Sequence, residues 1–93
     1  MRKQIKAFFQ QYIDMADAVN YLTHHMSYYF INVCDKEYTM FGKAQLRFLV
    51  SAKVDKLSDK QIDKVIKIAL QNVIANNKAN YMVTHNAIYL SAV

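Results

Sequence analysis

The chain has 93 residues, of which 54% are hydrophobic, and its formal net charge is +5. This length suits one domain, the apolar content excludes a disordered chain, and the basic excess is typical of proteins that meet nucleic acids, acidic proteins or membranes. There is no proline and a single glycine, Gly42. Because these residues build most tight turns, their scarcity argues against an all-β fold and favours long helices.

The cysteine content and the distribution of apolar residues suggest the compartment. The single cysteine, Cys34, cannot form an internal disulfide, and no apolar run reaches the length of a membrane span, about 18 residues. We therefore expect a cytoplasmic protein without a membrane partner. The abundance of Lys, Asn, Ile and Tyr is what an AT-rich gene encodes and suggests a bacteriophage or another mobile element as the source.

Residues 5–33 are predicted to form one long helix. Apolar or aromatic residues recur there in steps of three and four, as in a helix that packs along its whole length on other helices. They are Ile5, Phe8, Tyr12, Met15, Val19, Leu22, Met26, Tyr29 and Val33, with Phe9, Ala16 and Phe30 beside them. The helix would be about 43 Å long, whereas a compact globule of this chain is roughly 30 Å across. We expect an elongated molecule that buries the excess stripe in a homodimer or higher oligomer.

A second face of this helix combines tyrosine with histidine. Its members follow at steps of four, three and four, with Ile13 and Ile31 beside them, and they are Asp17, Tyr21, His24 and Tyr28. Exposed tyrosine and histidine next to aliphatic side chains are typical of protein interfaces and of stacking platforms. We predict that this ridge binds a partner protein. Packing under another helix and contact with a ligand or nucleic acid are the alternatives.

The histidines do not predict a metal site. His24 and His25 are adjacent, so they diverge by about 100° on a helix and cannot easily hold one ion. Cys34 is expected to be a small, half-buried apolar residue. We predict no metal and no cofactor.

The element that follows, residues 40–56, has an ambiguous pattern. Thr39 is a candidate N-cap, and alternating apolar residues from Leu46 to Val54 also fit a strand. Apolar residues at helical spacing occur on two sides of the segment. We predict a buried central helix.

The clearest helix start in the chain is at Ser58. Ser58 and Gln61 have the spacing of a capping box, and Leu57 with Ile62 fits a hydrophobic staple. The predicted core stripe is Ile62, Val65, Ile66, Ala69, Leu70, Val73 and Ile74, and the outer face holds Lys60, Lys64, Lys67, Gln71 and Lys78. Such a lysine face can follow phosphates, although lysine is also the ordinary solvated face of a helix. No helix-turn-helix is predicted, because no glycine lies at a turn before this helix.

Residues 79–93 fit either a last helix or a hairpin around His85 and Asn86, and we choose the helix. The predicted fold is therefore all-α, an elongated bundle of three to four helices in a single helical domain, residues 1–93. Catalysis is not expected, because the chain has one glutamate, no clustered aspartate pair and no glycine-rich phosphate loop.

These features predict a small, non-enzymatic helical interaction protein, an inhibitor or adaptor from a mobile element, which binds a host or cognate protein through its first helix. The alternative is a regulator that binds DNA or RNA through the lysine face of residues 58–78. A weaker hypothesis places a small anionic ligand such as a nucleotide in a groove between helices of the oligomer.

Overall fold

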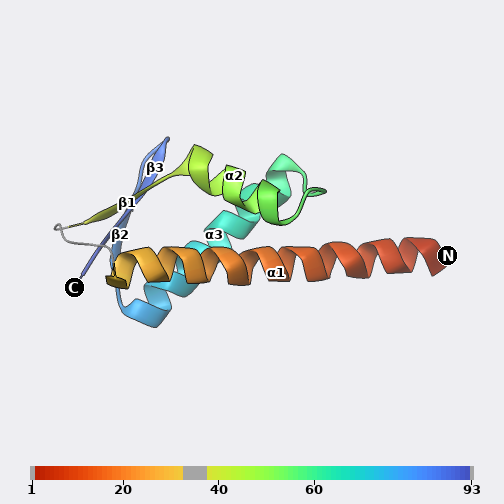
Figure 1. Ribbon diagram of the computed structural model, residues 1–93, viewed down its shortest axis with the longest axis horizontal. Coiled ribbons are helices and arrows are strands. Elements are labelled where there is room, and N and C mark those ends of the chain that lie inside the picture. The colour runs from red at the N-terminus through yellow and green to blue at the C-terminus, as the bar shows by residue number, and fades with distance from the viewer. Residues whose placement is uncertain (1, 33–37, 93) are drawn as a thin grey trace.

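The computed structural model describes residues 2–32 and 38–92, with the backbone alone at residues 2–9 and 11. Within these residues it contains three helices and three strands (Figure 1). In chain order they are α1 (Arg2–Asn32), β1 (Thr39–Gly42), α2 (Lys43–Lys53), α3 (Asp59–Asn77), β2 (Asn80–Val83) and β3 (Ala87–Ser91). The predicted all-α bundle is therefore wrong, because the chain forms an α+β fold.

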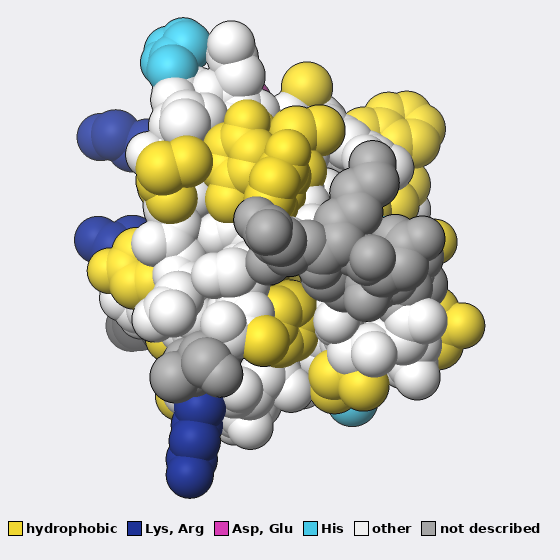
Figure 2. Space-filling view, turned by 90° about the vertical axis from the view of Figure 1, so that its left-hand side faces the viewer, with side chains coloured by type: hydrophobic (Ala, Val, Ile, Leu, Met, Phe, Trp, Pro, Cys, Tyr) yellow, Lys and Arg dark blue, Asp and Glu magenta, His cyan; other side chains and the backbone are white. Residues whose placement is uncertain are grey.

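The three strands form an antiparallel sheet in the order β1-β3-β2, at the end of the molecule opposite the N-terminus (Figure 1). In β3, Ile88 and Leu90 are buried against the helices, and Ile88 lies opposite Phe41 of β1. The other face of the sheet carries the cross-strand row Met40, Tyr89 and Met82. Hydrophobic side chains gather on this end of the molecule, and Lys and Arg side chains project along one side of it (Figure 2).

The sheet overturns two predictions. The predicted last helix is wrong, because residues 80–91 form the β2–β3 hairpin, which was the rejected alternative. Thr39 is a strand residue rather than the cap of a helix that begins at residue 40. The hairpin turn is closed by Thr84, whose backbone N–H donates to the Ala87 carbonyl at 2.9 Å and whose hydroxyl accepts from the Ala87 N–H at 3.1 Å. Pairing with β1, far away in the chain, completes the sheet, and a local helical pattern cannot show that pairing.

Helix α1 is unbroken, as predicted. Its 31 residues span about 46 Å, and the molecule measures 52 × 23 × 17 Å. The segment from Met15 to Phe30 packs on α3 and the sheet, with Ala18, Leu22 and Met26 fully buried. The N-terminal part projects beyond the other elements (Figure 1).

The predicted core stripe of α1 is therefore wrong at three described positions. Tyr12 is 72% exposed and Tyr29 is 41% exposed, and Ala16 is exposed as well. Tyr12 precedes the packed segment, Ala16 lies on its exposed side, and Tyr29 lies near the end of α1. The side chains of Ile5, Phe8, Phe9 and Val33 lie outside the described residues, as does Cys34.

The core of α3 is confirmed almost completely. All the predicted core residues of this helix are buried except Ile74, which is partly buried against the same cluster. The prediction for α2 was only partly correct. The segment is a helix, but only Leu46 and Val50 are buried, and Phe48 on the opposite side is 72% exposed. Helix α2 thus covers the core from outside rather than passing through it.

Candidate nucleic-acid interface

Helices α2 and α3 follow one another in the chain with a short turn between them, which is the connectivity of a helix-turn-helix. Val54, the C-cap of α2, has an extended backbone, and its N–H donates to the Val50 carbonyl at 2.9 Å. Residues 54–58 make the turn, and Ser58 then starts α3 with the predicted capping box. The Gln61 N–H donates to the Ser58 hydroxyl at 3.2 Å, while the Ser58 N–H donates to the Gln61 side chain at 2.8 Å. These reciprocal bonds satisfy two backbone donors and fix where α3 begins.

The lysine face of α3 is exposed along its length. Buried residues hold the opposite side of the helix on α1, so the lysines point to solvent. The exposed members are Lys60, Lys64, Lys67 and Gln71. Lys78 is also exposed, but it is the C-cap and has a left-handed backbone, with φ of 53°. It lies about 21 Å along the helix from Lys64 and therefore belongs to the far end of this face.

Helix α2 adds two cations to the same side. The Arg47 guanidinium contacts the Asp63 carboxylate of α3 through Nε and Nη2, both at 3.0 Å. Both side chains are about half exposed, 56% and 54%, so the pair contributes less than about 1 kcal/mol to stability. Lys43, the first residue of α2, is partly buried. The pair fixes the direction of Arg47 and uses the charge of Asp63, while Lys60, Lys64 and Lys67 form no ion pair with the acidic side chains that the structure describes.

The β2–β3 hairpin, residues 80–91, which we call the wing, lies next to α2. The Lys43 N–H donates to the Asn86 carbonyl at 2.8 Å, so the turn of the wing is joined to the first residue of α2. His85 and Asn86 at the tip are exposed. Lys43 and Arg47 of α2 and Lys67 of α3 line one groove together with Tyr81 and Val83 of the wing.

The four residues of the predicted ridge on α1, Asp17, Tyr21, His24 and Tyr28, are all exposed. His24 also borders a polar crevice with Asn72, Asn76 and Asn77 of α3. The crevice is bridged by hydrogen bonds from Asn72 to Thr23, at 3.4 Å, and from Asn77 to Ser27, at 3.3 Å.

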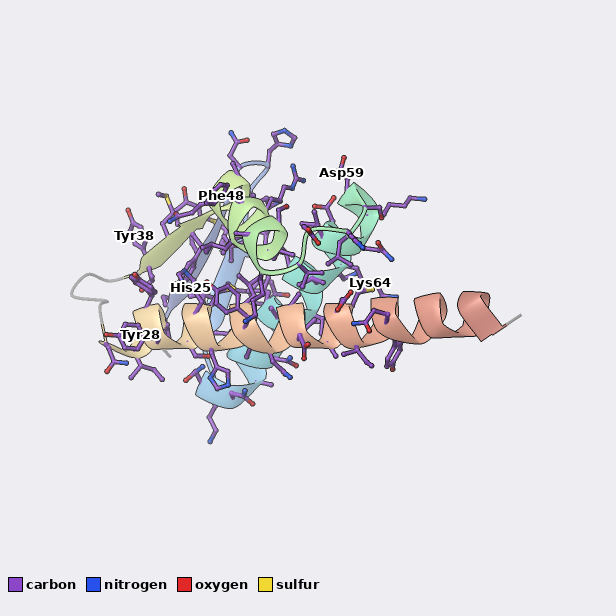
Figure 3. All side chains as sticks on the ribbon, turned by 45° about the vertical axis from the view of Figure 1, so that its right-hand side comes forward. His25, Tyr28, Tyr38, Phe48, Asp59 and Lys64 are labelled. Carbon is purple, nitrogen blue, oxygen red and sulfur yellow. The ribbon has the colours of Figure 1, made fainter. Side chains whose placement is uncertain are left out.

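Two tyrosines of the ridge also belong to a chain of rings that we call the aromatic flank, which consists of Tyr21, His25, Tyr28 and Tyr29. Ring centroids lie 6.4 Å apart for Tyr21 and His25, 4.7 Å for His25 and Tyr29, and 5.6 Å for Tyr28 and Tyr29. His25 lies on the side of α1 that faces α2, and the Lys53 ammonium is 5.5 Å from the Tyr21 ring (Figure 3). Partial burial lowers the pKa of His25 below its ordinary value.

Sequence reasoning missed several of these residues. Lys43 and Arg47 belong to a segment that was interpreted as buried on both sides, so their basic side chains were not considered. Tyr29 was assigned to the core and His25 was not assigned. A step of four connects Tyr21 with His25 and His25 with Tyr29, and this spacing was visible in the sequence.

Among residues 2–32 and 38–92, no group of three or more His, Cys, Asp or Glu side chains is arranged to hold a metal ion. None of the described helices is long and apolar enough to cross a membrane. Comparison with known proteins gave no match: no protein-family model, curated protein or solved structure matches this chain.

Proposed function

We propose that the protein is a non-enzymatic regulator that binds double-stranded DNA through α2, α3 and the wing. The observation that supports this is the exposed face of Lys60, Lys64, Lys67 and Gln71 on the second helix of a helix-turn-helix. The element order, with a hairpin after this helix and a strand before the first, is a winged helix-turn-helix arrangement. From the sequence alone this function was the alternative to protein binding. It suits the cytoplasmic location that the single cysteine predicts.

The shape of the surface suits a duplex. The major groove of DNA, about 12 Å wide, admits one α-helix, and in a helix-turn-helix the N-terminal part of the second helix enters it. In this arrangement Lys64 and Lys67 reach phosphates or guanine edges, and Gln71 pairs with adenine. The wing tip at His85 and Asn86 then lies along the neighbouring backbone.

The charges predict how this binding responds to salt. Each lysine that neutralises a phosphate releases condensed counterions, so the logarithm of the affinity falls with that of the salt concentration by about 0.9 per contact. Loss of a phosphate contact should therefore reduce both the affinity and the slope.

The experiment is fluorescence anisotropy with a labelled duplex of about 30 base pairs of mixed sequence, between about 50 and 200 mM salt. We expect Lys64→Ala with Lys67→Ala to weaken binding at least tenfold and to lower the slope by about two. The matched control, Lys53→Ala with Lys78→Ala, removes the same charge from the C-terminal ends of α2 and α3, remote from the N-terminal part of α3 that enters the groove. If both pairs weaken binding equally, or the wild type does not bind, the proposal is wrong.

Self-association through the projecting part of α1 is a second candidate. Tyr12 lies on the side of α1 that becomes the core-facing side further along the helix, yet it is 72% exposed. The apolar spacing continues in the sequence to Phe8 and Ile5. A second copy that covers this stripe would also place two helix-turn-helix units on one duplex, as dimers that bind two half-sites do.

Sedimentation velocity tests the dimer. We expect Tyr12→Glu to give a monomer at concentrations where the wild type is dimeric, because the substitution places a charge in the contact. Ile13→Glu is the control, since Ile13 is 51% exposed and lies about 100° around the helix from Tyr12. A wild type that is monomeric at all concentrations contradicts this candidate.

We propose the aromatic flank, which shares Tyr21 and Tyr28 with the predicted ridge, as a surface for a host or cognate protein. Three of its four residues, Tyr21, Tyr28 and Tyr29, are exposed, and tyrosine is enriched in protein contacts. Photo-crosslinking from position 28, with position 60 on α3 as the control site, tests this role. We expect a protein adduct from position 28 that is unchanged by nuclease; adducts from both positions, or from neither, contradict it.

A further inference from the structure

A groove with an apolar floor lies between α3 and the wing. It encloses about 440 Å³, which is within the range of sites for small organic ligands, about 300 to 1,000 Å³. The apolar lining comes from both elements and consists of Ile66, Leu70, Ile74, Tyr81, Val83 and Ile88. We call it the wing groove.

The groove is open because β2 extends beyond the helices. Tyr81 pairs with Leu90 and Val83 with Ile88, so each pair points to the same face of the sheet. On β3 the two residues are 0% and 1% exposed, whereas Tyr81 and Val83 on β2 are 60% and 45% exposed. The inner face of β2 therefore lacks the cover that its neighbour has, and apolar surface faces water there.

The rim of the groove is basic. Lys43 and Arg47 of α2 and Lys67 of α3 line it. Asp63 is the one acidic residue in its lining, and Arg47 holds it at 3.0 Å. The two lysines thus give the groove a net positive charge next to an apolar floor.

We propose that the wing groove binds a small amphipathic anion, an aromatic carboxylate or sulfonate, and that this ligand releases DNA. The ring lies against Tyr81 and Val83, and the anionic group lies between Lys43 and Lys67. A nucleic-acid backbone suits this floor poorly, because phosphates require polar partners and the apolar side chains offer none. The release of DNA rests on the proposed function, since Lys67 and Gln71 belong both to the groove and to the DNA surface.

The probe is 8-anilinonaphthalene-1-sulfonate, whose fluorescence rises in apolar sites. We expect one probe per chain in the wild type, and binding at least tenfold weaker in Val83→Asp, which places a carboxylate in the groove. Met82→Asp is the matched control, because Met82 is 57% exposed in the same strand and points to the other face of the sheet. It should bind the probe as the wild type does. Circular dichroism checks that both variants are folded.

A neutral analogue tests the role of charge. N-phenyl-1-naphthylamine has the same rings without the sulfonate, and we expect it to bind at least tenfold more weakly. Equal binding of the two probes, equal loss in both Asp variants, or several probes per chain would overturn the ligand site.

The coupling to DNA is tested separately. In anisotropy with a duplex that carries a red dye, the sulfonate should release DNA from the wild type and from Met82→Asp. For Val83→Asp, the duplex affinity measured with the probe should equal the affinity of the same variant without the probe. A wild type that binds the probe but no duplex contradicts the proposed function and leaves the ligand site standing. Simultaneous binding of probe and duplex contradicts only the coupling.

Discussion

The exposed face of α3 and the aromatic flank of α1 differ in how their residues relate to one another. On α3 the cations Lys60, Lys64 and Lys67 are spaced along the helix and touch no described acidic side chain, whereas on α1 the rings of Tyr21, His25 and Tyr29 contact one another. Separated like charges favour an extended anionic partner and are sensitive to salt, while contacting rings favour a partner that excludes water. The two faces therefore suit different classes of partner.

The largest expected effect in this comparison concerns Asp63, the acid beside the lysine face. Asp63→Asn should tighten duplex binding by about fivefold, because it removes a negative charge and frees Arg47 for phosphate. Asp17→Asn makes the same change in net charge on α1 and should leave the affinity unchanged. Anisotropy measures both, and equal tightening would mean that only net charge matters.

The next effect concerns the start of α3, which positions the lysine face. Ser58→Ala removes the hydroxyl that accepts from the Gln61 N–H, and it should lower the free energy of unfolding by about 1 kcal/mol. Urea denaturation measures this loss. Ser51→Ala, at an exposed position inside α2, is the control and should cause little or no loss. If Ser58→Ala is neutral, the capping box does not stabilise the helix start.

At the C-terminal end of α3, a substitution should increase the free energy of unfolding rather than lower it. Lys78 has a left-handed backbone with φ of 53°, a conformation that glycine adopts without strain. Lys78→Gly should raise the free energy of unfolding by about 0.5 kcal/mol, and Lys78→Ala should not. A loss of stability in the glycine variant, measured by urea denaturation, would contradict the assigned backbone.

The smallest expected effect is the pH dependence of stability that His25 of the aromatic flank causes. Burial lowers the pKa of His25 in the folded protein, so the unfolded chain binds the proton more tightly. The contribution of neutral His25 to the free energy of unfolding is therefore complete above the ordinary histidine pKa, about 6.5. It decreases as the pH falls through that pKa toward the lower pKa of the folded protein. His25→Phe should reduce this decrease in urea denaturation between about pH 7.5 and 5.5. If His25→Phe loses as much stability over this range as the wild type does, burial of the His25 imidazole is not the cause of the decrease.

The helix-turn-helix shows why part of the site escaped sequence analysis. We excluded the motif because no glycine precedes the lysine-rich helix, but Lys78 is the one described non-glycine residue with a positive φ. The turn at residues 54–58 therefore consists of ordinary backbone conformations, with extended geometry at Val54 and Ser58. A turn of this kind does not require glycine, so its absence carried no information.

The lysine face and the ring spacing on α1 were predictable, since both follow from the period of a helix. The contacts that these faces make with neighbouring helices were not predictable. His24 came to border a crevice with residues of α3, and Arg47 came to pair with Asp63 of α3. Both events depend on how two helices pack, which no spacing within one helix records.

The sequence by itself determined the length of α1, the start of α3 at Ser58 and the core side of α3, because each depends on residues within a few turns of one another. Only the tertiary structure decided that residues 80–91 form strands. Tyr81 and Val83 acquire their conformation from β3, and β3 acquires part of its pairing from Phe41, more than forty residues earlier. Strand pairing supplies hydrogen bonds from distant residues, so it can override a helical pattern that is equally good locally.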